Sequence, residues 1–155
     1  MIAGVVVRRL RPIRDERGEL CELMRSDDPL FRAFGQLYYT TARPGVVKAW
    51  HRHARQTDHL MAVGPPVRIA MVDGREASPT FGEAQDLVAG RDEPTLVQIP
   101  PGVWHGFTPA GDEDALVLNL PTELYDYDDP DEIRLDPFDN DLAYDWRAHG
   151  AVTGG

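Results

Sequence analysis

The chain has 155 residues, which is the length of one domain and enough to bury a hydrophobic core without cross-links. It carries 26 acidic and 16 basic residues, for a formal net charge of −10. This balance argues against nucleic acid as a partner, because such binding needs many contacts that neutralise phosphates. The single cysteine, Cys21, excludes an internal disulfide framework and a cysteine-based metal cluster.

The N-terminal segment does not read as a targeting signal. Residues 1–7 are apolar, but Arg8 and Arg9 end the apolar run, whereas a secretory signal places its charges before a longer apolar stretch. No segment reaches the length of a membrane span. We therefore expect a cytoplasmic protein that has no membrane partner.

The predicted elements are strands separated by turns. Fourteen glycines and thirteen prolines leave few uninterrupted helical windows, and Pro29 limits residues 26–34 to a helical turn. Short runs rich in β-branched or aromatic residues, bounded by Pro, Gly or Asp, predict the strands. In chain order they cover residues 2–7, 19–24, 35–41, 45–53, 59–63, 67–72, 96–99, 102–108 and 115–120. Regular short strands of this kind predict an all-β sandwich or barrel.

The domain organisation is simple. We expect a single domain over residues 1–150, followed by a short tail at 151–155. Composition changes after residue 120, and residues 126–145 hold nine acidic side chains against one basic one, Arg134. We interpret this stretch as a solvated acidic wrap around the barrel.

Three histidines and an aspartate form the first chemical pattern. His51 and His53 are two residues apart, so both imidazoles face the same side of a predicted strand. Asp58 follows after a turn, and His105 enters a later strand behind a Pro-Pro-Gly turn. Converging imidazoles with a carboxylate are ligands for zinc, iron, nickel or copper. The alternative is incidental placement, which is common for two histidines on a strand, and the third histidine counts against it.

These segments resemble the two motifs of the cupin superfamily, which implies a jelly-roll barrel with its site in the barrel mouth. The matching runs are Gly45-Val-Val-Lys-Ala-Trp-His51-Arg-His53 and Pro101-Gly-Val-Trp-His105. Asp58 stands where the superfamily has glutamate.

A more specific resemblance covers most of the chain. The segments Asp15-Glu-Arg-Gly-Glu-Leu-Cys-Glu22, Ser78-Pro-Thr-Phe-Gly82, Ile99-Pro-Pro-Gly-Val-Trp-His105-Gly-Phe and Ile133-Arg-Leu-Asp-Pro137 are similar to those of the dTDP-4-dehydrorhamnose 3,5-epimerase family. The resemblance implies a homodimer that needs no cofactor and binds a sugar or sugar nucleotide.

The family's reaction exchanges protons beside a keto group, which needs a base on one face of the sugar and an acid on the other. The resemblance makes His51 the base. The late aspartate that orients this base in the family is missing, so Asp73 or Asp58 would have to replace it. Asn119 stands in place of the tyrosine acid and cannot donate a proton, which leaves Tyr125 as the substitute.

Other positions match substrate-contacting residues of the family. By resemblance these are Arg17, Glu22, Gln36, Lys48, His105 and Asn119, with Arg17 expected to reach the partner subunit's barrel. Three functions therefore stay open. The first is an epimerase-like sugar isomerase with His51 as base, for which we expect little or no proton exchange because both the acid and the aspartate that orients the base are missing from their family positions. The others are a metal-dependent cupin acting on a small oxygenated substrate and a non-catalytic sugar-binding barrel.

Overall fold

The computed structural model describes all 155 residues and consists of strands with one short 3₁₀ helix, which confirms the all-β prediction. The helix is η1 (Trp146–His149). The strands are β1 (Val6–Arg9), β2 (Ile13–Asp15), β3 (Gly18–Leu20), β4 (Tyr38–Ala42), β5 (Val46–Arg52), β6 (Asp58–Ala62), β7 (Val67–Asp73), β8 (Ala84–Ala89), β9 (Thr95–Ile99), β10 (Val103–Pro109), β11 (Ala115–Asn119), β12 (Ile133–Arg134) and β13 (Thr153–Gly154).

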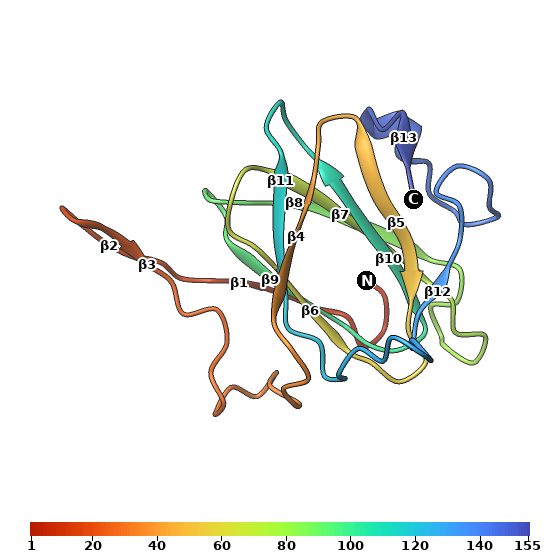
Figure 1. The fold of residues 1–155 in the computed structure, drawn as a ribbon, viewed down its shortest axis with the longest axis horizontal. Helices are drawn as coiled ribbons and strands as arrows, with labels where there is room; N and C mark the ends of the chain where they lie inside the picture. Colours follow the sequence, from red (N-terminus) through yellow and green to blue (C-terminus); the bar gives the residue numbers. More distant parts are fainter.

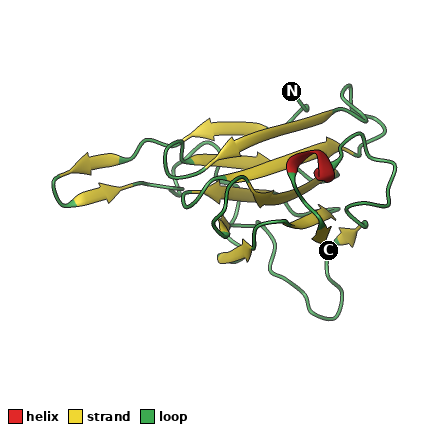
Figure 2. Cartoon of the chain, turned by 90° about the horizontal axis from the view of Figure 1, so that it is seen from above, coloured by secondary structure: helices red, strands yellow, loops and turns green.

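Two sheets form the body of the molecule (Figures 1 and 2). One has the order β1-β9-β6-β11-β4, and the other has the order β12-β5-β10-β7-β8, with β13 added in parallel beside β5. Almost all neighbours are antiparallel, so short turns can join them. The inner faces of the two sheets pack on each other around the main hydrophobic core, which includes Ile69, Met71, Leu60 and Val97.

The six-stranded sheet is covered on its outer face as well. Strand β7 is buried along nearly its whole length. Its Ala70 and Val72 point away from the main core into a second cluster with Trp50 and Trp146. The ring centroids of the two tryptophans are 5.1 Å apart. The C-terminal segment therefore does wrap the barrel, and it does so with apolar side chains that bury this face.

Several details differ from the sequence prediction. The strand expected over residues 19–24 ends at Leu20, and the short strands β2 and β12 were not predicted. The first strand begins at Val6 rather than at residue 2, because Gly4 forms a turn at a φ of 79°. Strand β8 was not predicted because its exposed side chains interrupt the apolar pattern. The segment at 151–155 is not a free tail, since Ala151 is buried and β13 pairs with β5.

Strands β2 and β3 form a hairpin that projects from the body (Figure 1). Ile13 and Leu20 lie on this hairpin with 69% and 60% of their surface exposed. Each strand of the projecting hairpin therefore carries one exposed aliphatic side chain.

Candidate functional site

A pocket of about 390 Å³ opens at one end of the space between the two sheets. It receives side chains from strands of both sheets and from the segment that follows β11. Its lining consists of Gln36, Tyr38, Thr40, Lys48, His51, His53, Gln56, Leu60, His105, Gly106, Phe107, Asn119, Tyr125, Glu132, Arg134 and Gly155. A larger hollow of about 580 Å³, lined by residues 64–66, 88–93 and 113, contains none of the histidines.

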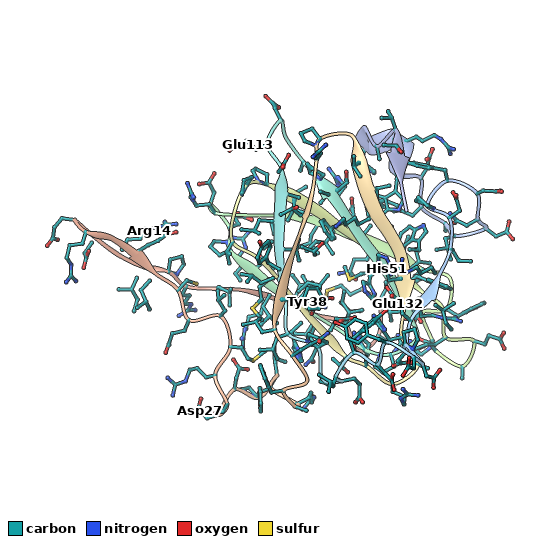
Figure 3. All side chains as sticks on the ribbon, viewed as in Figure 1. Arg14, Asp27, Tyr38, His51, Glu113 and Glu132 are labelled. Carbon is teal, nitrogen blue, oxygen red and sulfur yellow. The ribbon has the colours of Figure 1, made fainter.

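His51 lies on β5 and faces Glu132, which immediately precedes β12 (Figure 3). His51 Nε2 is 3.7 Å from Glu132 Oε1, and Arg134 Nη2 donates to Glu132 Oε2 at 2.9 Å. The pairing of Arg134 with His51 across β12 and β5 sets this arrangement. Glu132 is therefore the carboxylate placed to interact with the ring of His51.

The environment of His51 keeps its ring neutral. Burial, with a further contribution from His105, lowers the pKa of His51 to about 4, although Glu132 acts in the opposite direction. Burial is also the main cause that lowers the pKa of His105. A neutral imidazole at pH 7 is the form that can accept a proton.

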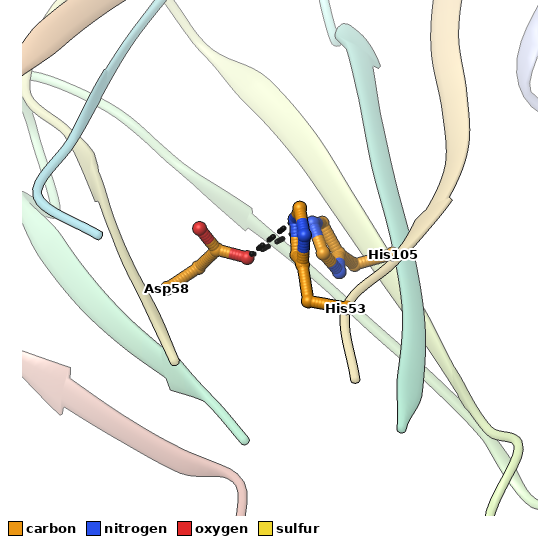
Figure 4. A group of neighbouring side chains, drawn as sticks. All are labelled: His53, Asp58 and His105. Carbon is orange, nitrogen blue, oxygen red and sulfur yellow. Dashed lines mark ion pairs between the residues drawn. The ribbon is translucent and has the colours of Figure 1, made fainter. Parts of the chain in front are cut away.

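His53 and His105 converge on Asp58 (Figure 4). The Nε2 atoms of the two rings are 3.3 Å and 3.4 Å from Asp58 Oδ2. Ligand atoms of these three residues all lie within 4.8 Å of one another, and His51 is not part of this group. The sequence expected His51, His53, Asp58 and His105 to form one cluster, and the structure divides them into a cluster of three and a His51–Glu132 pair.

Asn119 and Tyr38 are paired directly across β11 and β4. The amide Nδ2 of Asn119 donates to the Tyr38 hydroxyl at 2.9 Å and to Asp58 Oδ1 at 2.8 Å. Burial raises the pKa of Tyr38, with Asp58 acting in the same direction, so this phenol keeps its proton at neutral pH. A protonated phenol therefore lies on the five-stranded sheet, beside the position where the resemblance had led us to expect one.

Comparison with known proteins identifies the group to which this pocket belongs. The family model for dTDP-4-dehydrorhamnose 3,5-epimerase matches residues 1–153. The chain belongs to the dTDP-4-dehydrorhamnose 3,5-epimerase family. This confirms the resemblance drawn from the sequence motifs.

Individual relatives agree with the family match. A probable low-salt glycan biosynthesis epimerase from Haloferax volcanii is 44% identical, over 96% of this chain and 98% of the relative. The spore coat polysaccharide biosynthesis protein SpsL of Bacillus subtilis is 36% identical, over 94% and 97%. The crystal structure of a dTDP sugar isomerase from Desulfovibrio desulfuricans is 33% identical, covers 94% of this chain and 92% of that chain, and has a TM-score of 0.88. The shared fold confirms the predicted cupin-type jelly roll.

Some residues that family resemblance assigned to substrate lie in the pocket. They are Gln36, Lys48, His105 and Asn119, and Tyr125, which was expected as the substitute acid, lines the same pocket. Lys48 Nζ donates to Thr40 Oγ1 at 2.9 Å and forms no ion pair within 4.0 Å. Lys48 is thus a pocket cation that no carboxylate neutralises.

Other assigned residues lie outside the pocket of their own chain. Arg17 is at the tip of the β2–β3 hairpin and pairs with Asp15, and Glu22 pairs with Arg25. Both are exposed, so within one chain neither contacts a ligand in the pocket. Only a second subunit could bring Arg17 to a pocket.

Asp73 does not orient His51, and that expectation is wrong. Its carboxylate accepts hydrogen bonds from Arg75 Nε at 2.7 Å, Ser78 Oγ at 2.5 Å and Thr80 Oγ1 at 2.6 Å. These bonds outweigh burial and lower the pKa of Asp73 well below its ordinary value. Asp73 therefore holds the turn of the Ser-Pro-Thr-Phe-Gly segment, which explains that motif as structural.

Tyr38 and Glu132 were missed as site residues. Glu132 belongs to the acidic stretch interpreted as solvated, yet only 15% of its side chain is exposed. A signal for Tyr38 exists only in the strand register, which places it opposite Asn119.

No helix of the structure has both the length and the apolar character needed to cross a membrane.

Proposed function

We propose that this protein epimerises a nucleotide-linked keto sugar at a carbon beside the keto group, with His51 as the base. The observation that carries the proposal is the neutral, partly buried imidazole of His51 in the family's base position, facing a carboxylate inside the pocket. Removal of a proton from carbon converts the ring to an imidazolium, which Glu132 at 3.7 Å stabilises by charge.

The acid must approach the sugar from the face opposite the base. His51 is on β5 of the six-stranded sheet, and Tyr38 is on β4 of the five-stranded sheet, so the two side chains reach the pocket from different sheets (Figure 3). The Tyr38 oxygen accepts a hydrogen bond from Asn119 and still has its own hydrogen to donate. Tyr38 is therefore our proposed acid, ahead of Tyr125, which packs on Tyr127 with ring centroids 5.0 Å apart and lies on the segment after β11.

Lys48 supplies the charge that the intermediate needs. Loss of the proton leaves an enolate, whose oxygen is stabilised by a cation or hydrogen-bond donors held in place beforehand. Lys48 lines the pocket, and its ammonium is not engaged by a carboxylate. We assign it to the keto oxygen. With Tyr38 as the acid, we expect the protein to be more active than the sequence predicted, because the acid would be at a different position rather than missing.

The test uses dTDP-4-keto-6-deoxyglucose in D₂O, with proton exchange and configuration at C3 and C5 followed by NMR. Wild-type protein should exchange deuterium and invert at least one of the two carbons. His51→Ala should lose both, because the base starts the reaction. Absence of exchange by the wild-type protein would refute the proposed function.

The Tyr38→Phe variant tests the role of the acid independently of the role of the base. Without the phenol, His51 still removes and returns protons on its own face, so exchange should persist while inversion falls by ~10²–10⁴, the usual contribution of a positioned acid. Tyr125→Phe is the matched control and should keep inversion within a few-fold of wild type. Loss of inversion in Tyr125→Phe alone would transfer the acid role to that residue.

A further inference from the structure

The hydrogen bonds of His53 and His105 fix where each ring carries its proton. His53 Nδ1 contacts the backbone oxygen of Asp131, and His105 Nδ1 contacts the backbone oxygen of Val103 at 3.2 Å. A carbonyl oxygen only accepts hydrogen bonds, so both Nδ1 atoms must be donors. In the neutral form of each ring, Nε2 therefore presents a lone pair.

Both lone pairs face the same carboxylate oxygen. Asp58 is 1% exposed, and its Oδ2, which is 3.3 Å and 3.4 Å from the two Nε2 atoms, has no hydrogen-bond partner. Its other oxygen, Oδ1, accepts from the amides of Gln56 and Asn119. The Gln56 amide also lies 3.2 Å from His53 Nε2. A buried carboxylate oxygen that faces two lone pairs without a donor between them is unfavourable unless a cation lies among the three atoms.

The spacing of these atoms fits a metal ion. Two ligands of one tetrahedral zinc ion, with bonds of ~2.0–2.1 Å, lie ~3.3–3.4 Å apart, which matches both distances to Asp58 Oδ2. Metal-binding histidines also characteristically donate their second ring nitrogen to a backbone carbonyl or a carboxylate. The alternative cation is a proton. One proton on a single Nε2 would pair an imidazolium with the carboxylate but leave the lone pair of the other ring facing Oδ2, and protons on both rings would leave a net positive charge in a buried cluster.

We propose that His53, Asp58 and His105 bind one divalent transition metal ion, zinc being the first choice. Two imidazoles and a carboxylate suit zinc, iron, nickel or cobalt, whereas magnesium and calcium prefer shells made of oxygen. His53 and His105 line the pocket while Asp58 does not, so the ion would have its open position toward the pocket. This site goes beyond the proposed epimerisation and does not depend on it.

The experiment measures metal binding without any sugar. Protein freed of its affinity tag and treated with chelator is titrated with ZnCl₂ by calorimetry, and with CoCl₂ by visible absorption. We expect one ion per chain and the intense visible bands of tetrahedral cobalt. Asp58→Asn should weaken zinc binding by at least ~100-fold, because it removes a ligand. His51→Ala is the matched control and should change it by less than about threefold.

The same Asp58→Asn variant tests the metal-free cluster. An amide nitrogen in place of Oδ2 can donate to the ring nitrogens, so the metal-free variant should melt at or above the wild-type temperature. Zinc should raise the melting temperature of wild type, by mass action, and leave that of the variant unchanged.

Three results would overturn the proposal. One is a wild-type protein that binds neither zinc nor cobalt. A second is zinc binding that His51→Ala weakens as much as Asp58→Asn does. The third is a metal-free Asp58→Asn protein that melts well below wild type, which would show that Asp58 is paired with protonated rings. None of these results involves turnover, so failure here is distinct from failure of the epimerase proposal.

Discussion

Glu132→Gln tests whether this carboxylate stabilises the imidazolium that forms on His51. The change keeps the shape of the side chain and removes its charge. Two unit charges 3.7 Å apart interact by about 1 kcal/mol in water and by about 4 kcal/mol at the effective dielectric near a protein surface. Both side chains are about one-fifth exposed or less, at 21% and 15%, which favours the upper part of this range. Arg134 already neutralises part of the Glu132 charge, and this reduces the interaction energy between Glu132 and the imidazolium of His51.

We therefore expect a loss of about 1.5–3 kcal/mol, which is a fall in kcat of about 10- to 100-fold. KM should change little, because the charge pair forms only as the proton leaves carbon. The assay is inversion of the dTDP-keto sugar followed by NMR, with melting temperature measured in parallel. Glu113→Gln, on an exposed loop (Figure 3), is the matched control and should match wild type. A Glu132→Gln enzyme with kcat within twofold of wild type would refute the reasoning, and an equal loss in both variants would indicate a nonspecific effect.

Three further predictions concern stability and assembly. Asp73→Asn breaks a buried ion pair and should cost about 3 kcal/mol, or about 6–12 °C in melting temperature at pH 7. Because hydrogen bonds lower the pKa of Asp73, this difference should shrink as pH falls below 3.8; an unchanged melting temperature at pH 7 would contradict it. Gly106→Ala should reduce both stability and inversion, since a Cβ there would lie 2.2 Å from Ala49 Cβ, while Gly111→Ala, with open space around it, should do neither. From the family resemblance we expect light scattering to show a dimer, and Ile13→Asp combined with Leu20→Asp should convert it to a monomer. A monomeric wild-type protein at micromolar concentration would contradict the expected homodimer and the cross-subunit role of Arg17.

The sequence was a good guide to the fold because each strand signal is local. Alternation and turn residues predicted most strands of both sheets, and the spacing of His51, His53, Asp58 and His105 brought all four to one end of the barrel. The spacing of these residues along the chain could not predict which side chain each of them contacts, however. Strand β5 ends at Arg52, so His53 lies just beyond it and turns toward Asp58 while His51 turns toward Glu132.

Residues that depend on long-range register escaped prediction. Tyr38 precedes Asn119 by 81 positions and meets it only because β4 pairs with β11. Glu132 is one acidic residue among many in its stretch, and its burial follows from the pairing of β12 with β5. Asp73 is the opposite case, because the sequence analysis named it as a site residue and the structure does not support that role. Its carboxylate instead accepts hydrogen bonds from Arg75 and Thr80 in the turn that follows it.

The short segment that begins at Asp131 anchors both halves of the pocket. The Asp131 carboxylate accepts the backbone N–H groups of residues 54–56, its carbonyl holds the ring of His53, and the next residue faces His51. A shift of this segment would therefore displace the base and a ligand of the three-residue cluster together. Thermodynamic linkage makes such coupling mutual: by whatever factor a cation on His53 alters the affinity for the sugar, the sugar alters the affinity for the cation by the same factor.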